Sequence, residues 1–150
     1  MKKNFNIAIL YSEFNKPIVE NLVKGAETAL NEHKGLKIKI KKYSVPGAFE
    51  LPLMMNSLCK SKNKKPDGVI VLGCIIKGDT AHFEYVALPV SINLQKISYD
   101  NLMPMGFGVL TCYTPEQAFE RSLLDENNIS NNKGYESARV VLEMISKLKK

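Results

Sequence analysis

A continuous apolar run that ends in a polar turn is the feature that most restricts what this chain can fold into. Residues Gly68–Ile76 read GVIVLGCII, which is typical of a strand covered on both faces in a parallel sheet. The turn Lys77–Thr80 follows, and we expect Asp79 or Thr80 to cap a helix that begins near Ala81. The free backbone N–H groups and the positive dipole end of that helix would suit an oxyanion, most simply a phosphate.

His82 lies in the first turn of this expected helix, close to whatever the turn binds. Because histidine changes its charge near neutral pH, His82 is a candidate proton carrier. The alternative is a capped helix with a histidine on its surface. We favour a functional role because the cap, the basic side chain of Lys77 and His82 come together at the end of a parallel strand, where α/β proteins bind ligands.

Strand and helix patterns alternate along the chain without a repeat or a linker. This alternation predicts a three-layer α/β domain, and 150 residues suit a single domain over residues 1–150. We expect strands at residues 6–12, 36–43, 68–76 and 105–112, and helices at 17–33, 51–62, 81–98, 115–124 and 134–148. The lysine-studded strand at 36–43 suits a sheet edge, and Pro89 requires a kink or local disruption of its helix.

The net charge of +6 arises from lysines that cluster at 37–42, at 60–65 and at the C-terminus. These clusters lack the interleaved aromatic residues of a nucleic-acid surface, so solvated faces are the better interpretation, with attraction of anionic substrates second.

No stretch approaches the ~20 apolar residues of a membrane span, and no signal-peptide cleavage site follows the start of the chain. We therefore expect a cytoplasmic protein that binds neither nucleic acid nor membrane.

The three cysteines, Cys59, Cys74 and Cys112, are far apart and lie in helix or strand patterns. They indicate core thiols and neither a disulfide framework nor a CxxC site. The two histidines, His33 and His82, lack HExxH spacing, so we expect no catalytic zinc.

In a parallel sheet the loops that follow the strands emerge at one edge, so four loops of this chain can converge on one site. Phe14 could stack on a planar heterocycle or fill a gap under its loop. Gly47 and Ala48 would allow a ligand to approach the backbone closely. Glu50 could accept hydrogen bonds from a polyol or reflect a charge preference at a helix start. Arg121 could make a bidentate contact to a phosphate or be a solvated helix residue.

Other common α/β functions lack their motifs in this chain. Ser12 and Glu13 do not supply the acidic group that holds magnesium in receiver domains, and the first strand is not followed by a flavodoxin-type phosphate loop. There is no GxGxxG for a dinucleotide and no GxxxxGK[ST] for a nucleoside triphosphate.

Six sequence blocks, in order and spanning nearly the whole chain, closely resemble the 6,7-dimethyl-8-ribityllumazine synthase family. The blocks VPGAFELP at 45–52 and LGCIIKGDTAHFEYV at 72–86 are jointly highly specific. The others are FN at 14–15, FGVLT at 107–111, EQAFER at 116–121 and NKG at 132–134.

The resemblance implies a flavodoxin-like α/β/α sandwich with a four-stranded parallel sheet, and the penultimate step of riboflavin biosynthesis. In that step 5-amino-6-(D-ribitylamino)uracil condenses with 3,4-dihydroxy-2-butanone 4-phosphate through an imine, and phosphate and water are lost. No cofactor or metal is implied. A functional link to riboflavin synthase is left open.

The resemblance also assigns roles to individual residues. His82 moves protons, and a neighbouring subunit contributes Phe107, Arg121 and Lys133, so that each site is an interface in a homo-oligomer. The pyrimidine and ribityl groups contact Phe14, Ala48, Phe49, Glu50, Cys74, Ile75, Ile76, Phe107 and Lys133. The phosphate is held by Gly78, Asp79, Thr80 and Arg121, with Lys77 and Glu136 as candidate supporting residues.

The chain departs from the family pattern in two places. Between the EQAFER and NKG blocks it has the longer segment Ser122–Asn131, where many members have a short Ala-Gly-rich one. Because a longer connection is associated with free pentamers, we favour a pentamer over a capsid of 60 subunits, but the extra length puts the placement of Lys133 and of Glu136, a candidate partner for His82, in doubt. Lys77 occupies a position where arginine is frequent in the family. Lysine keeps the positive charge but lacks the planar guanidinium that can make two parallel hydrogen bonds.

Two other functions remain open on the same scaffold. One is a non-catalytic protein that binds or stores a flavin or lumazine, against which His82 and Arg121 argue. The other is a structural assembly whose shell matters more than its chemistry.

Overall fold

The computed structural model describes residues 4–148, and these contain one sheet of four parallel strands in the order β2-β1-β3-β4. The strands are β1 (Asn4–Ser12), β2 (Lys37–Val45), β3 (Gly68–Ile76) and β4 (Met105–Cys112). Residues 1–3 and 149–150 of the expected domain lie outside the described part of the chain. The parallel sheet confirms the fold class expected from the sequence.

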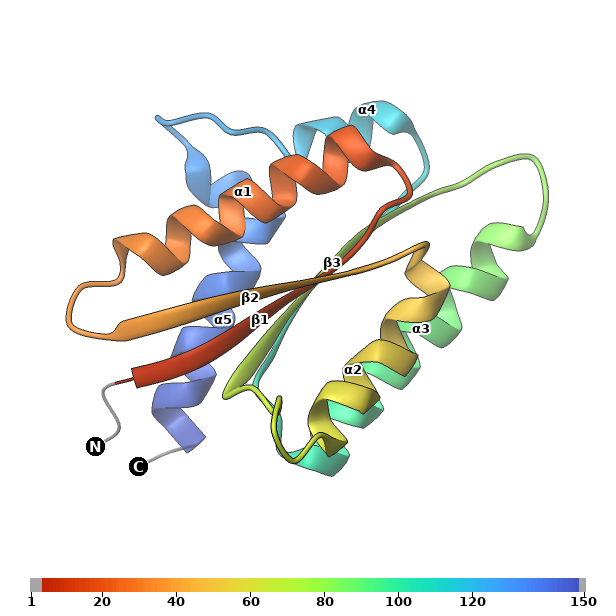
Figure 1. Ribbon diagram of the computed structural model, residues 1–150. Helices are drawn as coiled ribbons and strands as arrows, with labels where there is room; N and C mark the ends of the chain where they lie inside the picture. The colour runs from red at the N-terminus through yellow and green to blue at the C-terminus, as the bar shows by residue number, and fades with distance from the viewer. Residues whose placement is uncertain (1–3, 149–150) are drawn as a thin grey trace.

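Helices cover both faces of this sheet (Figure 1). One face packs against α1 (Lys16–Glu32) and α5 (Lys133–Leu148), and the other against α2 (Leu51–Lys60) and α3 (His82–Asn101). The short helix α4 (Pro115–Glu120) and the 3₁₀ turns η1 (Ala48–Glu50) and η2 (Ile129–Asn131) lie in the connections. The arrangement is a three-layer α/β/α sandwich of the flavodoxin-like kind.

The central strand β3 explains why its sequence is apolar throughout. Its side chains alternate between the two layers, so that Ile70 and Leu72 join the α1/α5 core while Val69 and Val71 join the α2/α3 core. β2 lies at an edge of the sheet, as its alternating lysines predict. No helix among residues 4–148 is long and apolar enough to cross a bilayer.

The strands end in two pairs at one edge of the sheet, and β3 runs past the end of β1, since Tyr11 near that end pairs with Leu72. Ser12 at the end of β1 pairs with Val45 of β2, and Ile76 at the end of β3 pairs with Cys112 of β4. The loops after all four strands therefore leave the sheet at one edge, as expected for parallel strands.

Several predicted limits differ from those observed. β2 extends to Val45, and the 3₁₀ turn η1 precedes α2 because Glu50 closes a reciprocal cap on Gly47. α4 ends at Glu120, before Ser122, whose backbone N–H and hydroxyl both donate to the Phe119 carbonyl.

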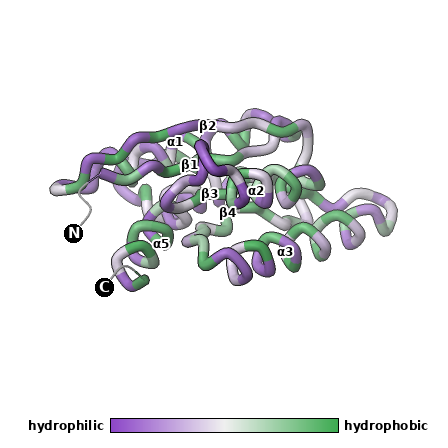
Figure 2. The backbone as a smooth tube through the Cα atoms, turned by 60° about the horizontal axis from the view of Figure 1, so that its bottom comes forward, coloured by the Kyte–Doolittle hydropathy of each residue, from purple (hydrophilic) through white to green (hydrophobic). Residues whose placement is uncertain are grey.

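The helix α3 is longer than expected. It runs to Asn101 and continues through Pro89, which does not interrupt it. It is capped by Leu102, the next residue, which has left-handed backbone angles (φ 47°, ψ 40°). Figure 2 shows hydrophobic residues recurring along its length, interspersed with hydrophilic ones.

Candidate functional site

A cleft of about 850 Å³ lies at the carboxyl edge of the sheet, where the ends of β1 and β3 meet η1 and the start of α3. Two grooves elsewhere on the described chain are smaller, at about 580 and 570 Å³. Of the residues predicted for a site, the cleft is lined by Phe14, Ala48, Phe49, Glu50, Cys74, Ile75, Ile76, Gly78, Thr80 and His82. Gly47, where the sequence suggested a close approach of ligand to backbone, also lines it, as do Phe83, Tyr85 and Val86, to which sequence reasoning gave no role.

Asn15 is the cleft residue whose role the sequence analysis missed. It has left-handed backbone angles (φ 57°, ψ 45°), and its carbonyl accepts the first hydrogen bonds of α1 from Ile18 and Val19. Its side-chain Nδ2 donates to the Cys74 carbonyl of β3 over 2.9 Å. Asn15 thereby ties the loop that carries Phe14 to the end of β3. The available signal was an asparagine in a turn, two residues before Pro17, since asparagine tolerates this backbone conformation.

Phe14 presents an exposed ring at the cleft, 71% accessible to solvent. Its backbone N–H donates to the Pro46 carbonyl over 3.2 Å, so the loop after β1 is also bonded to the loop after β2. An exposed aromatic face on a loop anchored at two points is suited to stack on a flat ring.

Glu50 lies at the rim of the cleft, at the end of η1. Its Oε2 accepts a hydrogen bond of 2.9 Å from the Gly47 N–H. An ionised carboxylate offers about four lone-pair sites, so this bond orients the group and leaves it able to accept from hydroxyls. The neighbouring Ala48 is buried, and its small side chain leaves room above it.

The turn before α3 exposes the beginning of a helix of 20 residues. Of the two capping candidates, Thr80 makes the side-chain bond, because its Oγ1 accepts from the His82 N–H over 3.3 Å. His82 is the first residue of α3 and is exposed at the cleft. Asp79 lies in the same exposed turn but is not among the residues that line the cleft. An imidazole side chain thus lies directly beside a helix start of the kind that can bind an anion.

Lys77 is not among the residues that line this cleft. Its Nζ lies 3.9 Å from Oε1 of Glu84 and 5.7 Å from the centre of the Tyr113 ring. Both partners belong to the same subunit and lie on α3 and just after β4. Within one subunit the lysine thus contacts the surroundings of the turn and does not line the cleft.

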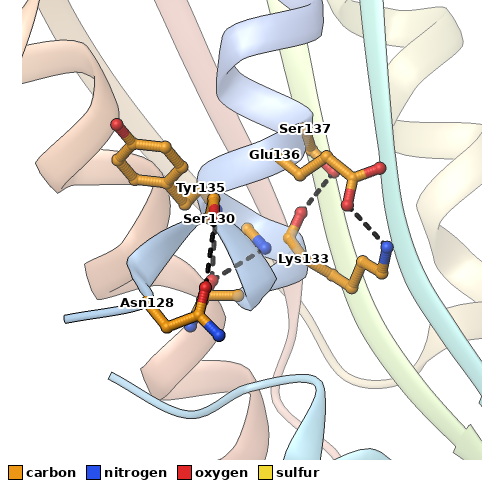
Figure 3. Close-up of polar contacts among 8 residues, drawn as sticks. Asn128, Ser130, Lys133, Tyr135, Glu136 and Ser137 are labelled. Carbon is orange, nitrogen blue, oxygen red and sulfur yellow. Dashed lines mark hydrogen bonds and ion pairs between the residues drawn. The ribbon is translucent and has the colours of Figure 1, made fainter. Parts of the chain in front are cut away.

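Phe107, Arg121 and Lys133 line a second, smaller hollow of about 180 Å³ beside β4. They do not line the main cleft, so one subunit does not bring every predicted site residue together. Glu136 pairs with Lys133, whose Nζ lies 2.5 Å from its carboxylate (Figure 3). Inside one subunit Glu136 thus has Lys133 as an ion-pair partner, and its pairing with His82 stays a prediction.

The cysteines are free and buried, as expected. Burial raises the pKa of the Cys74 thiol to about 12, and the nearby Cys112 adds to this effect. Burial likewise raises the pKa of Cys59 and of Cys112. Cys74 therefore offers the cleft its backbone and not a thiolate.

Comparison with known proteins identifies what this arrangement is similar to. A sequence model of the family described as 6,7-dimethyl-8-ribityllumazine synthase matches residues 4–149. A protein of that name from Campylobacter lari is 37% identical over 150 residues, which cover 100% of this chain and 92% of the relative. A second, from Campylobacter jejuni, is 37% identical over 146 residues, covering 97% of this chain and 91% of the relative.

Proposed function

The chain belongs to the 6,7-dimethyl-8-ribityllumazine synthase family, and on that premise we propose the condensation of 5-amino-6-(D-ribitylamino)uracil with 3,4-dihydroxy-2-butanone 4-phosphate as its activity. The products are 6,7-dimethyl-8-ribityllumazine, phosphate and water. The observation that carries this proposal is the single cleft at which Phe14, Glu50 and the Thr80–His82 turn meet. It offers a flat apolar face, a polyol acceptor and an anion site beside a proton carrier.

Each substrate has a counterpart in this cleft. The pyrimidine stacks on Phe14 and contacts the backbone of Cys74–Ile76, while the ribityl chain extends over Ala48 and Phe49 toward Glu50. The phosphate occupies the start of α3, where Gly78, Asp79 and Thr80 present the turn. N–H donors and a helix dipole suit a phosphate that is bound and then expelled, because both stabilise the dianion without forming a covalent bond to it.

His82 moves the protons of the reaction. The 5-amino group attacks the ketone carbonyl, water leaves as the imine forms, and phosphate departs after a proton is lost from the adjacent carbon. Ring closure then expels a second water. An imidazole beside the departing phosphate can take up and return these protons, which typically contributes ~10²-fold or more to the rate. Holding both substrates together supplies much of the remainder.

We propose that the site is completed by a neighbouring subunit, which contributes Phe107, Arg121 and Lys133. The support is that these residues surround a hollow separate from the cleft in the same subunit. Arg121 would add a bidentate contact to the phosphate.

An exposed apolar stripe on α3 supports assembly into an oligomer. Its members are 40% or more exposed and follow one another at helical spacing; they are Tyr85, Leu88, Ile92, Tyr99 and Leu102. A monomer would leave this stripe in water at a cost of ~25 cal/mol per Å². We favour a pentamer over a capsid because the segment Ser122–Asn131 is long.

We also propose that the enzyme works in the cytoplasm, where its three free thiols would stay reduced. Its lumazine product would serve riboflavin synthase. None of the comparisons favours the non-catalytic alternative.

Shared sites can be tested by mixing two defective subunits. Arg121→Ala and His82→Ala are each expected to lower activity, but a ring containing both carries some sites with an intact His82 and an intact neighbouring Arg121. For random mixing in a head-to-tail ring, about a quarter of the sites would be intact. Co-expressed variants should therefore regain about a quarter of wild-type turnover, whereas separately purified variants combined without exchange should not. Activity of the mixed rings no higher than the average of the two variants would contradict sites built from two subunits.

A further inference from the structure

Asn132 is a fully buried polar residue that the proposed chemistry does not use. It is 0% exposed, and both ends of its side-chain amide are engaged. Its Oδ1 accepts from the backbone N–H groups of Gly134 (2.9 Å) and Tyr135 (3.1 Å). Its Nδ2 lies within hydrogen-bond distance of the carbonyls of Asn21, Ser122 and Leu123, at 3.1, 2.9 and 3.2 Å.

These two ends do different things. The Oδ1 bonds cap the start of α5, which any good capping side chain can do. The Nδ2 bonds reach back across the chain to the residues that follow Arg121, which a capping serine cannot do. A backbone hydrogen bond of 2.9 Å also joins the Lys133 N–H to the Arg121 carbonyl. We call this bond, together with those from Asn132 Nδ2 to the Ser122 and Leu123 carbonyls, the closure, because it joins the two ends of the segment between Arg121 and Lys133.

The surroundings of Asn132 leave it little freedom. A Cβ on Gly25 of α1 would collide with the Asn132 side chain, and a Cβ on Gly134 would collide with the Leu22 carbonyl. The crossing of α1 and α5 is thus closed tightly around this amide. Tyr135 adds a link, since its hydroxyl donates to Glu32 over 2.8 Å.

The segment that Asn132 closes is itself on the surface. Residues 123–128 are exposed and make local turns, such as the bond of 3.0 Å from the Asn127 N–H to Asp125. Beyond the closure, Lys133 is held by Glu136, and its carbonyl accepts from the Ser137 hydroxyl over 2.6 Å (Figure 3).

We propose that Asn132 is a positioning residue that holds Arg121 and Lys133 at a fixed separation for the neighbouring active site, whatever the length of the segment between them. This rests on the proposed function, in which those two side chains bind substrate. It explains how an enlarged connection can coexist with an unchanged pair of binding residues: the closure at its base, and not the segment itself, sets their geometry.

The first test is Asn132→Ser, which keeps a side-chain acceptor for the start of α5 and loses the reach of Nδ2. We expect KM for the butanone phosphate to rise about tenfold or more, because a binding group displaced by about 1 Å loses that much. A purely structural defect would reduce the folded fraction and the apparent kcat and leave KM unchanged. Asn128→Ala, in the exposed segment, is the matched control and should leave KM as in the wild type.

The second test asks whether Asn132 acts through Arg121. In an Arg121→Ala background, Asn132→Ser should raise this KM no further, since the group it positions is already gone. An equal increase in both backgrounds would overturn the proposal. A wild type that forms no lumazine, or an Arg121→Ala variant with unchanged KM, would instead refute the proposed function.

The third test does not depend on how well Asn132→Ser folds. Replacing the exposed residues 125–128 with two glycines shortens the segment and leaves the closure intact. We expect both KM values to stay within about twofold of the wild type, as for independent sites. A tenfold rise in either KM would show that the segment itself sets the site and would overturn the proposal.

Discussion

Substitutions at Asn15 test the cleft and separate two contributions to stability, the side-chain hydrogen bond and the left-handed backbone conformation. Its side chain supplies one hydrogen bond to the Cys74 carbonyl, and its backbone holds a φ of 57°. A net hydrogen bond is worth about 1 kcal/mol, and the left-handed conformation costs an ordinary residue about 1 to 2 kcal/mol more than it costs glycine. Asparagine meets both demands because its short polar side chain tolerates this conformation.

Two substitutions at this position therefore have different expected costs. Asn15→Ala loses the bond and introduces the backbone strain, so it should lower the free energy of unfolding by about 2 to 3 kcal/mol. Asn15→Gly loses the bond without the strain and should cost about 1 kcal/mol. The gap of about 1 to 2 kcal/mol between the variants measures the backbone term alone.

Urea unfolding at one fixed protein concentration is the assay, since the stability of an oligomer depends on concentration. KM for the pyrimidine should rise more in the alanine variant, because the loop that carries Phe14 is anchored by Asn15. The reasoning is refuted if alanine proves no more destabilising than glycine, or if KM for the butanone phosphate rises instead.

The other predictions concern proton transfer, assembly and the buried thiol. His82→Ala should lower kcat about a hundredfold in the lumazine absorbance assay, while His33→Ala, far from the cleft, should match the wild type. Ile92→Glu should shift the sedimenting species to monomers, since the exposed stripe on α3 then carries a charge. The folded pKa of Cys74 lies above its usual value of 9.0, near 12, so its contribution to stability is complete below pH 9 and is lost as pH rises toward 12. Unfolding free energies measured across that range should fall less steeply in Cys74→Ala.

The elements with the strongest sequence signals were predicted best. β3 and β4 have the predicted limits, β3 because it is buried almost throughout, and β4 because Pro104 precedes it and the Thr114–Pro115 helix start follows it. β2 runs to Val45, beyond its predicted end at 43, because Ser44 and Val45 still pair with β1. α2 begins where predicted but ends at Lys60, because Ser61 is extended and its hydroxyl accepts from the Lys64 N–H, a local turn that apolar spacing does not encode. α3 ends three residues beyond the predicted limit of 98, at a left-handed Leu102 whose N–H donates to the Ser98 and Tyr99 carbonyls, and sequence pattern does not mark a leucine as such a cap.

The loops that line the candidate cleft were predictable, and the geometry of individual side chains was less so. Parallel topology alone brings the loops of Phe14, Glu50 and His82 to one edge. The direction of the Lys77 side chain depends on Tyr113, which lies 36 residues away in the sequence and was not part of the argument. The closure at Asn132 joins chain segments 111 and 10 residues apart, and local pattern does not reveal such bonds.

The most direct measurement is the absorbance of lumazine formed from the two purified substrates by the wild-type protein, with phosphate release followed in parallel. The account predicts one phosphate per lumazine formed, and for Arg121→Ala a higher KM for the butanone phosphate than in the wild type. A folded, oligomeric wild type that binds the pyrimidine but forms no lumazine would contradict the assignment and favour a binding protein on this scaffold.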